Sequence, residues 1–286
     1  MQNKIKLNNF NVGTFNVHGL KSNIRKEHLV KDLEQYKLDI ICLQETKIVN
    51  ELDINIGHSR LVNFKPNCVH YGSGFLISNK VNSSILHKEQ IYDRICYLDI
   101  QLEESKILTL INVYGPTQSK VELDEKCRDE FYLKLGELIK KKKKDSKGKG
   151  MILIAGDFNS RVGSNDSDFP DGCIGPHSRG PRNDNGQTLV DFCESNGLCI
   201  TNTLFQHPAR HKTTWTQTKH MKKTGKVSTI FCMLDYILCQ QRHRHMFTNS
   251  RSYAGTTLTS DHRLVAAKIV VSWHRMRRMK CTLTGR

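Results

Sequence analysis

The chain has 286 residues, of which 37% are hydrophobic and 25% are charged. This balance fits a globular protein that buries a sizeable core. No stretch reaches the roughly 18 consecutive apolar residues of a membrane span. The polar N-terminus, MQNKIKLNNFNVGTF, lacks the apolar segment of a secretory signal. We therefore expect an intracellular protein that does not cross a membrane.

The charge is strongly positive, because 44 Lys and Arg residues face 28 Asp and Glu residues and leave a net charge of +16. Such an excess favours a polyanionic partner, with nucleic acid first and an anionic membrane surface second. Two segments concentrate it, the lysine run Lys140–Lys144 and the sequence WHRMRRMK near the C-terminus. A solvated helix end or a linker is the alternative interpretation of the lysine run.

The ten cysteines do not form any C-x-x-C pair of the kind that zinc sites use. Most of them lie in apolar runs such as DIICLQE and FCMLDYILC. Free cysteine is among the most buried residue types. We expect reduced, buried thiols.

Taken in chain order, the apolar runs predict a series of strands with a few helices between them. The predicted strands are Asn11–Asn16, Asp39–Gln44, Gly74–Ser78, Ile95–Leu102, Ile107–Tyr114, Met151–Ala155, Met233–Cys239 and Arg263–Val271. A helix is predicted after Ser22, with Leu29 and Leu33 on one face. A longer helix is predicted over Lys120–Lys143, where apolar residues recur every four positions.

The segment from Ser160 to Gly186 is rich in Gly, Pro, Asp, Asn and Ser and predicts a long surface loop, followed by a short helix over Gln187–Asn196. QQRHRHMF, from Gln240 to Phe247, is interpreted as a basic loop. No linker divides the chain, so we expect one domain over residues 1–272 and a basic tail over residues 273–286. Strands that are apolar without strict alternation indicate an α+β fold in which two packed sheets are flanked by helices.

Polar residues that can bind a metal or a phosphate stand where several strands end. Asn16 ends the first strand, Glu45 follows LDIICLQ, Tyr114 ends LTLINVY, and Asp157 and Asn159 follow MILIAG. SDHRLVAAKI begins with Asp261 and His262, and Asp235 lies inside the apolar run MLDYILC. A buried carboxylate needs a cation or hydrogen-bond donors. Each residue alone also has an ordinary structural interpretation.

Together these residues fit phosphodiester hydrolysis. A hard cation such as Mg²⁺, or Mn²⁺ in its place, binds few protein oxygens, and Asn16, Glu45 and Asp261 would suffice. Asp235 beside the imidazole would fix the tautomer of His262. Asn159 would donate to the charge that develops on the phosphate.

The same segments resemble a known family. FNVHGL, LQET, NVYGP, GDFN, LDYIL and SDHRLV occur in this order and are similar to the signature blocks of the endonuclease/exonuclease/phosphatase superfamily, which has the DNase I-like fold. The resemblance implies a four-layer α/β sandwich with two mainly antiparallel sheets. GPRNDNGQTLVDFCESNGLCITNTLFQH and TTWT are similar to the apurinic-like endonucleases of RTE-type non-LTR retrotransposons, including craniofacial development protein 2-like sequences.

This resemblance implies a DNA endonuclease that leaves a 3′ hydroxyl and acts in the nucleus. Its implied roles are metal binding by Asn16, Glu45 and Asp261, phosphate contact by Tyr114, acid or water-activating chemistry by Asp157, transition-state stabilisation by Asn159, pairing of Asp235 with His262, and DNA contact by Thr214 and Trp215. Either Asp157 or His262 would activate the water.

One departure from the family pattern concerns His18, which stands where abasic-site repair enzymes of this fold carry an acid, and this argues against abasic-site specificity. Two other functions stay open. One is hydrolysis of another phosphoester, and the other is a retained nucleic-acid-binding module that does not cut. No G-x-x-x-x-G-K-[ST] motif occurs, so we expect no nucleotide cofactor. The sequence leaves the oligomeric state open.

Overall fold

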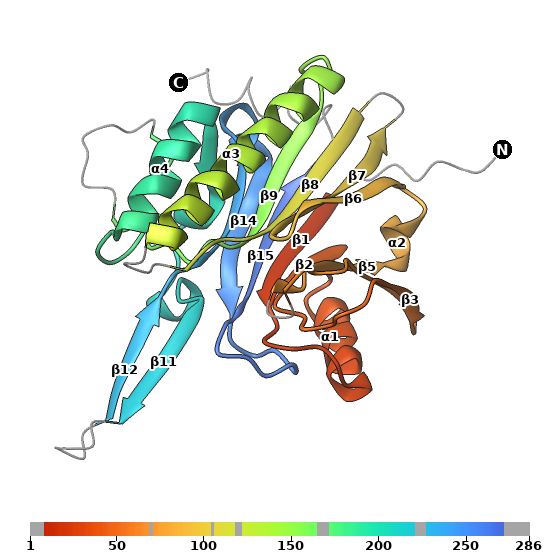
Figure 1. The fold of residues 1–286 in the computed structure, drawn as a ribbon, viewed down its shortest axis with the longest axis horizontal. Helices are drawn as coiled ribbons and strands as arrows, with labels where there is room; N and C mark the ends of the chain where they lie inside the picture. The colour runs from red at the N-terminus through yellow and green to blue at the C-terminus, as the bar shows by residue number, and fades with distance from the viewer. Residues whose placement is uncertain are drawn as a thin grey trace, which may run out of the picture.

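The computed structural model describes residues 9–68, 71–103, 106–117, 122–164, 172–220 and 227–271. Two β-sheets pack against each other in this part of the chain (Figure 1). In spatial order, the seven-stranded sheet contains β14 (Phe247–Tyr253), β15 (Leu264–Val270), β1 (Asn9–Asn16), β2 (Ile40–Gln44), β5 (Gly74–Ser78), β4 (Ser59–Asn63) and β3 (Leu52–Ile56).

The six-stranded sheet contains, again in spatial order, β10 (Leu198–Ile200), β13 (Asp235–Gln240), β9 (Met151–Asp157), β8 (Lys106–Tyr114), β7 (Ile95–Glu103) and β6 (Ile85–Tyr92). A separate hairpin, β11 (Trp215–His220) and β12 (Val227–Cys232), extends away from the two sheets (Figure 1). The helices are α1 (Asn23–Gln35), α2 (Asn79–Asn82), α3 (Glu122–Asp145) and α4 (Asp184–Asn196). Short 3-10 helices are η2 (Thr201–Thr203), η3 (Ala209–His211) and η4 (Gln241–Met246).

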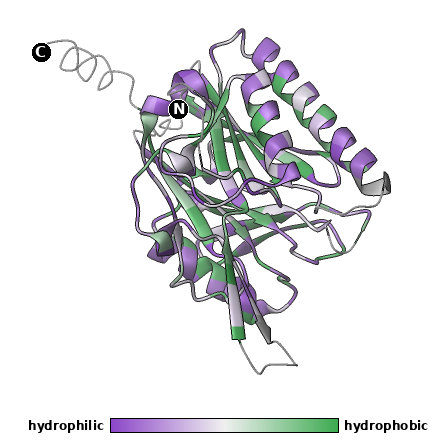
Figure 2. Ribbon diagram, turned by 90° about the vertical axis from the view of Figure 1, so that its left-hand side faces the viewer, coloured by the Kyte–Doolittle hydropathy of each residue, from purple (hydrophilic) through white to green (hydrophobic). Residues whose placement is uncertain are grey.

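The layers follow from which face of each strand is apolar. In β2, Ile40 and Cys42 belong to the core between the sheets, whereas Ile41 and Leu43 belong to the core under α1. Successive side chains of a strand point to opposite faces, so a strand covered on both faces is apolar throughout. On the other side, Phe131 of α3 and Leu189 of α4 pack on the six-stranded sheet. The strands are accordingly the most hydrophobic elements, and the helices carry both kinds of residue (Figure 2).

Most neighbouring strands are antiparallel, and the two parallel pairs are β1 with β2 and β8 with β9. The arrangement of helix, sheet, sheet and helix confirms the predicted four-layer α/β sandwich. Each of the predicted strands is present, with ends shifted by a few residues at most.

Two predictions between the strands were wrong. Helix α4 begins at Asp184, three residues before the predicted Gln187, because the side chain of Asn183 accepts a hydrogen bond from the backbone N–H of Gly186 and caps the helix. The predicted basic loop that starts at Gln240 is the helix η4, which buries His243 and Met246. Ser22 caps α1 as predicted.

The lysine run forms the last turns of α3, and part of it serves the fold. Lys142 is buried, lies 2.6 Å from a carboxylate oxygen of Asp99 and sits over the ring of Tyr97. Lys143 donates to the carbonyl of Asn196. The predicted tail over residues 273–286 lies outside the described residues. Every described cysteine is a free thiol, and none of the described helices is both long and apolar enough to span a membrane.

Candidate active site

The directions of the strands bring the predicted site residues to one place. In the seven-stranded sheet, β1 and β2 run parallel and end at Asn16 and just before Glu45, while β15 runs antiparallel to β1 and begins just after His262. In the six-stranded sheet, Tyr114 lies opposite Asp157 on parallel strands, and Asp235 lies opposite Asp157 on an antiparallel strand. The two sheets pack together, so these strand ends meet at one edge of the sandwich (Figure 1).

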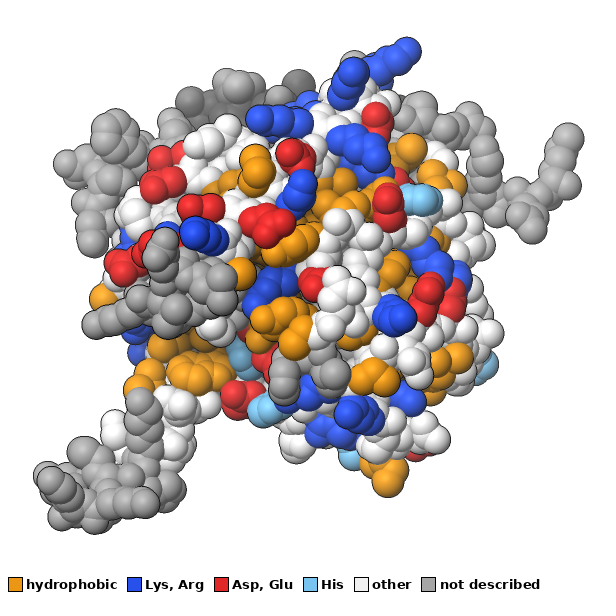
Figure 3. All heavy atoms as spheres, in the orientation of Figure 1, with side chains coloured by type: hydrophobic (Ala, Val, Ile, Leu, Met, Phe, Trp, Pro, Cys, Tyr) orange, Lys and Arg blue, Asp and Glu red, His pale blue; other side chains and the backbone are white. Residues whose placement is uncertain are grey.

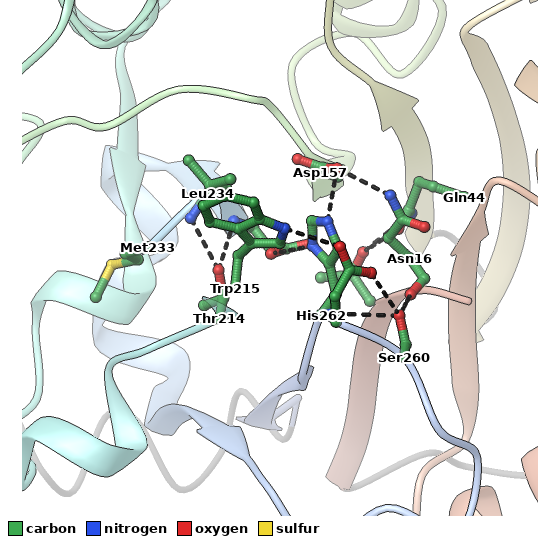
Figure 4. A network of polar contacts seen from close by, with 12 residues as sticks. Asn16, Gln44, Asp157, Thr214, Trp215, Met233, Leu234, Ser260 and His262 are labelled. Carbon is green, nitrogen blue, oxygen red and sulfur yellow. Dashed lines mark hydrogen bonds and ion pairs between the residues drawn. The ribbon is translucent and has the colours of Figure 1, made fainter. Parts of the chain in front are cut away.

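Asn16 connects the two sheets at this edge. Its side-chain amide donates to Glu45 Oε1 and to Asp157 Oδ2, both at 3.0 Å. Asn16 and His262 approach Asp157 from the neighbouring sheet (Figure 4). One amide nitrogen therefore holds two carboxyl groups beside each other.

A histidine lies between two buried carboxylates. The Nδ1 atom of His262 is 3.0 and 3.2 Å from the carboxylate oxygens of Asp235, and its Nε2 atom is 3.7 Å from Asp157 Oδ2. All three side chains are buried. Because Asp235 accepts only from a protonated nitrogen, the contact keeps the proton on Nδ1 and fixes the ring orientation. Nε2 then points toward Asp157.

The burial of this group shifts its proton equilibria. Burial and the neighbouring Asp235 charge raise the pKa of Asp157 to about 7. Burial alone would lower the pKa of His262, but the charges of Asp235 and Asp157 outweigh it and raise the pKa to about 10. At neutral pH the imidazole is therefore charged, and Asp157 exchanges its proton near pH 7.

Glu45 is held as a carboxylate at the open side of the group. Burial acts to raise its pKa, yet hydrogen bonds from Asn16 and Tyr114, together with the charge of Lys47, bring the pKa below its usual value. The Tyr114 hydroxyl donates to Glu45 Oε1 at 2.9 Å, and burial beside carboxylates raises the pKa of Tyr114 well above its usual value. Glu45 has a φ of 50°, a left-handed backbone that non-glycine residues adopt rarely and that clusters at functional sites.

Asn159 and Asp261 lie at the border of the site. The Asn159 backbone N–H donates to Asp157 Oδ1 at 2.9 Å, and its side-chain amide donates to the carbonyl of Gly115 at 2.9 Å. Asp261 is 44% exposed and accepts from the indole N–H of Trp215 at 3.0 Å. The hydroxyl of Ser260 bonds both the backbone of Asn16 and, at 3.4 Å, the carboxylate of Asp261.

The two residues predicted to touch nucleic acid differ in position. Thr214 is only 1% exposed, and its hydroxyl accepts from the backbone N–H groups of Leu234 and Asp235. The expected contact with DNA is therefore wrong for Thr214, which instead orients the start of β13 (Figure 4). Trp215 is partly exposed beside His262, so contact with DNA stays a prediction for this residue.

Sequence reasoning missed a cation beside the site. The guanidinium carbon of Arg94 is 3.9 Å from the ring centre of Tyr71 and 5.0 Å from that of Tyr114. Arg94 also donates to the carbonyls of Tyr114 and Gly115. It follows β6 in a segment, YDRIC, that carries no recognisable signal, and only the pairing of β7 with β8 brings it to Tyr114.

The donor set fits a hard divalent cation. Two carboxylates, Glu45 and Asp157, share one amide donor, and one nearby lysine, Lys47, lies 3.4 Å from Glu45. A cation bound to Glu45 would offset the negative charge held at this position, and Mg²⁺ prefers such oxygen ligands. A second possible ligand group, Asp157 with Asp235 and His262, has its donor atoms within 4.8 Å of one another. In that group the Nδ1 atom of the imidazole already bonds Asp235, so we regard the oxygen ligands around Glu45, together with the side-chain oxygens of Asn16 and Asp261, as the better match.

Comparison with known proteins identifies the family of this chain. The protein-family model described as endonuclease/exonuclease/phosphatase family matches residues 13–262. The chain is 31% identical over 259 residues to craniofacial development protein 2 of Bos taurus, an alignment that covers 90% of this chain and 40% of that protein. It is 28% identical over 159 residues to exodeoxyribonuclease III of Haemophilus influenzae, which covers 51% of this chain and 56% of that protein. The chain thus spans about two fifths of the length of the first of these relatives.

Solved structures share the fold at low sequence identity. The AP endonuclease LMAP from Leishmania major superposes with a TM-score of 0.66 at 14% identity, covering 93% of this chain and 89% of that one. The endonuclease domain of TRAS1, a telomere-specific non-LTR retrotransposon, superposes with a TM-score of 0.60 at 12% identity, covering 92% and 99%. With the family match extending from β1 to His262, the chain belongs to the endonuclease/exonuclease/phosphatase family.

Proposed function

We propose that this protein is a Mg²⁺-dependent phosphodiesterase that nicks DNA and leaves a 3′ hydroxyl. The observation that carries the proposal is the Asn16 amide, which holds Glu45 and Asp157 together while His262 approaches the same Asp157 oxygen. The net charge of +16 supports a polyanionic substrate. The family membership supports hydrolysis of a phosphoester.

In this proposal Glu45, Asn16 and Asp261 hold the cation, which when bound supplies Lewis-acid polarisation of a phosphoryl oxygen. Asp261 is the outermost member and is joined to Asn16 through Ser260. Mn²⁺ would fit the same oxygen ligands.

The chain's own residues handle the charge and the protons. Asp157, with a pKa of about 7, is suited to transfer a proton to or from an oxygen at neutral pH. The charged His262, oriented by Asp235, would stabilise negative charge on the phosphate beside it. Tyr114 stays protonated at neutral pH, and its hydroxyl would donate to a phosphate oxygen in place of Glu45. One side-chain amide hydrogen of Asn159 is donated to the carbonyl of Gly115, and the second could be donated to a phosphate oxygen.

Nicking of a supercoiled plasmid in the presence of Mg²⁺ tests the proposal. The wild-type chain should convert the plasmid to the open circle, and extension of the nick by a DNA polymerase should confirm a free 3′ hydroxyl. Glu45→Gln and Asp157→Asn should lower the rate by at least about a hundredfold. Glu194→Gln, on the exposed side of α4, is the matched control and should nick at the wild-type rate.

The other functions give different results in the same experiment. Equal rates in Glu45→Gln and in the wild type would refute the catalytic assignment. Salt-sensitive DNA binding without nicking in Mg²⁺ or Mn²⁺ would favour the non-cutting binding module. Turnover of a different phosphoester, with the plasmid intact, would favour the other hydrolases of the fold. We also propose a nuclear location, where a DNA substrate would be available, and imaging of a tagged chain in cells would test it.

A further inference from the structure

A second pocket lies immediately beside the candidate active site, at the base of the β11–β12 hairpin. Its volume is about 230 Å³. Three segments that leave the site also line it. Arg161 follows two residues after Asn159, Thr213 precedes Thr214, and Met233 precedes Asp235 by two residues. Residues that line the pocket are therefore close neighbours in sequence of Asn159, Thr214 and Asp235.

The polar wall of this pocket is cationic. Arg161, Arg179 and Lys212 line it, and none of the described acidic residues does. Burial and the charge of Arg179 lower the pKa of Lys212, so these two cations repel each other. Among the described residues, no carboxylate forms an ion pair with Arg179 or Lys212. An anion placed between them would relieve this repulsion.

The opposite wall is apolar and open to solvent. Ile230 and Phe231 of β12 line the pocket and are 37% and 54% exposed. Hydrophobic side chains gather on the surface where the hairpin joins the sandwich (Figure 3). A large exposed aromatic residue next to several cations is the combination that proteins use to bind single-stranded nucleic acid, with a base stacked on the ring and the phosphate on the cations.

We propose that this pocket binds one nucleotide of a single-stranded segment of DNA next to the cleavage site, with its phosphate on Arg161, Arg179 and Lys212 and its base on Phe231. This inference rests on the proposed function, because it assigns a substrate class to the same DNA-cutting site. A duplex that carries a single-stranded flap or gap is then a better ligand than a fully paired duplex. A paired base is stacked inside its helix and would have to be flipped out, at a cost of a few kcal/mol, before it could lie on Phe231.

Fluorescence anisotropy in EDTA, which prevents cleavage, tests the pocket with two probes: a labelled duplex with a single-stranded flap and the matching full duplex. The wild-type chain should bind the flapped probe more tightly. Phe231→Ala should weaken binding of the flapped probe by roughly tenfold or more and leave the duplex unchanged. Lys212→Gln should weaken the flapped probe and lower the slope of log K against log salt by about 1. Leu133→Ala and Lys134→Gln, on the exposed face of α3, are the matched controls and should behave as wild type.

The inference is overturned if the wild type does not distinguish the two probes, or if Phe231→Ala and Lys212→Gln bind the flapped probe as the wild type does. Circular dichroism checks that each variant is folded, which is expected for an exposed position such as Phe231. Plasmid nicking separates the two proposals. Flap preference that depends on Phe231 without any nicking refutes the enzymatic function and supports the pocket, whereas nicking with unchanged binding in Phe231→Ala refutes the pocket alone.

Discussion

Replacing Asp235 by asparagine removes one of the two negative charges that flank His262 and keeps the shape of the side chain. In the wild type the pKa of His262 is raised from 6.5 to about 10. Each pH unit between these values corresponds to about 1.4 kcal/mol, so the proton on His262 stabilises the fold by at most roughly 5 kcal/mol. A raised histidine pKa gives stability that is complete below pH 6.5 and is lost as the pH rises toward 10.

Asp235→Asn should lower the pKa of His262 by roughly 2 units, because a carboxylate in direct contact shifts a neighbouring cation by about 1–3 units. The pH-dependent part of the stability should fall by roughly 3 kcal/mol. Asp157 should also ionise at lower pH, since the Asp235 charge is one cause of its raised pKa.

The assay is NMR titration of the His262 ring in EDTA, combined with urea unfolding between pH 6 and 10. Asp191→Asn is the control and should titrate and unfold as the wild type does, because Asp191 is an exposed residue of α4 whose carboxylate bonds only Gln187 among the described residues. A His262 midpoint that stays near 10 in Asp235→Asn would refute the reasoning, because the charge of Asp235 would then not hold the proton.

Three further predictions concern stability. Burial and the neighbouring basic groups lower the pKa of His243 from 6.5 to about 4. The stability that the neutral His243 contributes should therefore be fully present above pH 6.5 and fall by roughly 2–3 kcal/mol as the pH drops toward 4. Urea unfolding of His243→Gln should show a free energy of unfolding that depends less on acid pH. Gly156→Ala places a Cβ atom on the carbonyl oxygen of Val113 on the neighbouring strand and should prevent folding, as judged by circular dichroism. Asn112→Leu removes the Asn112 oxygen that accepts from Gln44 and the amide that donates to the carbonyls of Leu43 and Gly74. Urea unfolding should show that the free energy of unfolding falls by roughly 3 kcal/mol or more.

The sequence predicts best those parts of the fold that are buried on both faces. Strands such as β2 and β9 are runs of buried, mainly apolar residues, and the polar residue that follows such a run has to lie where the strand ends. This is why the sequence predicts that Asn16, Glu45 and Asp157 lie at the ends of strands, as they do in the structure. Edge strands are different. β6 (ILHKEQIY) and β14 (FTNSRSY) mix polar and apolar residues because one side faces solvent, and neither was predicted.

Partners that are distant in sequence are the part that periodicity cannot predict. Thr214 was placed near DNA by its motif, but the pairing of its segment with Leu234 and Asp235 turns the hydroxyl inward. Lys142 was one of five equivalent lysines in the sequence, and only the position of Asp99 on β7 decides that it is buried. In both cases the outcome depends on which strand or helix lies opposite, which is a property of the packed sandwich.

A buried polar network beneath the site explains how side chains from two sheets keep the register that the site requires. Gln44, which precedes Glu45, donates to Asn112 Oδ1 at 2.6 Å across the interface between the sheets, and Asn112 precedes Tyr114 by two residues. Gln44 also bonds the hydroxyl of Thr14, two residues before Asn16. An apolar interface alone would tolerate sliding of one sheet on the other, whereas these directional bonds are satisfied in one register only. That register is the one in which Asn16 reaches both Glu45 and Asp157, so the same strands that carry the site residues also carry the bonds that align them.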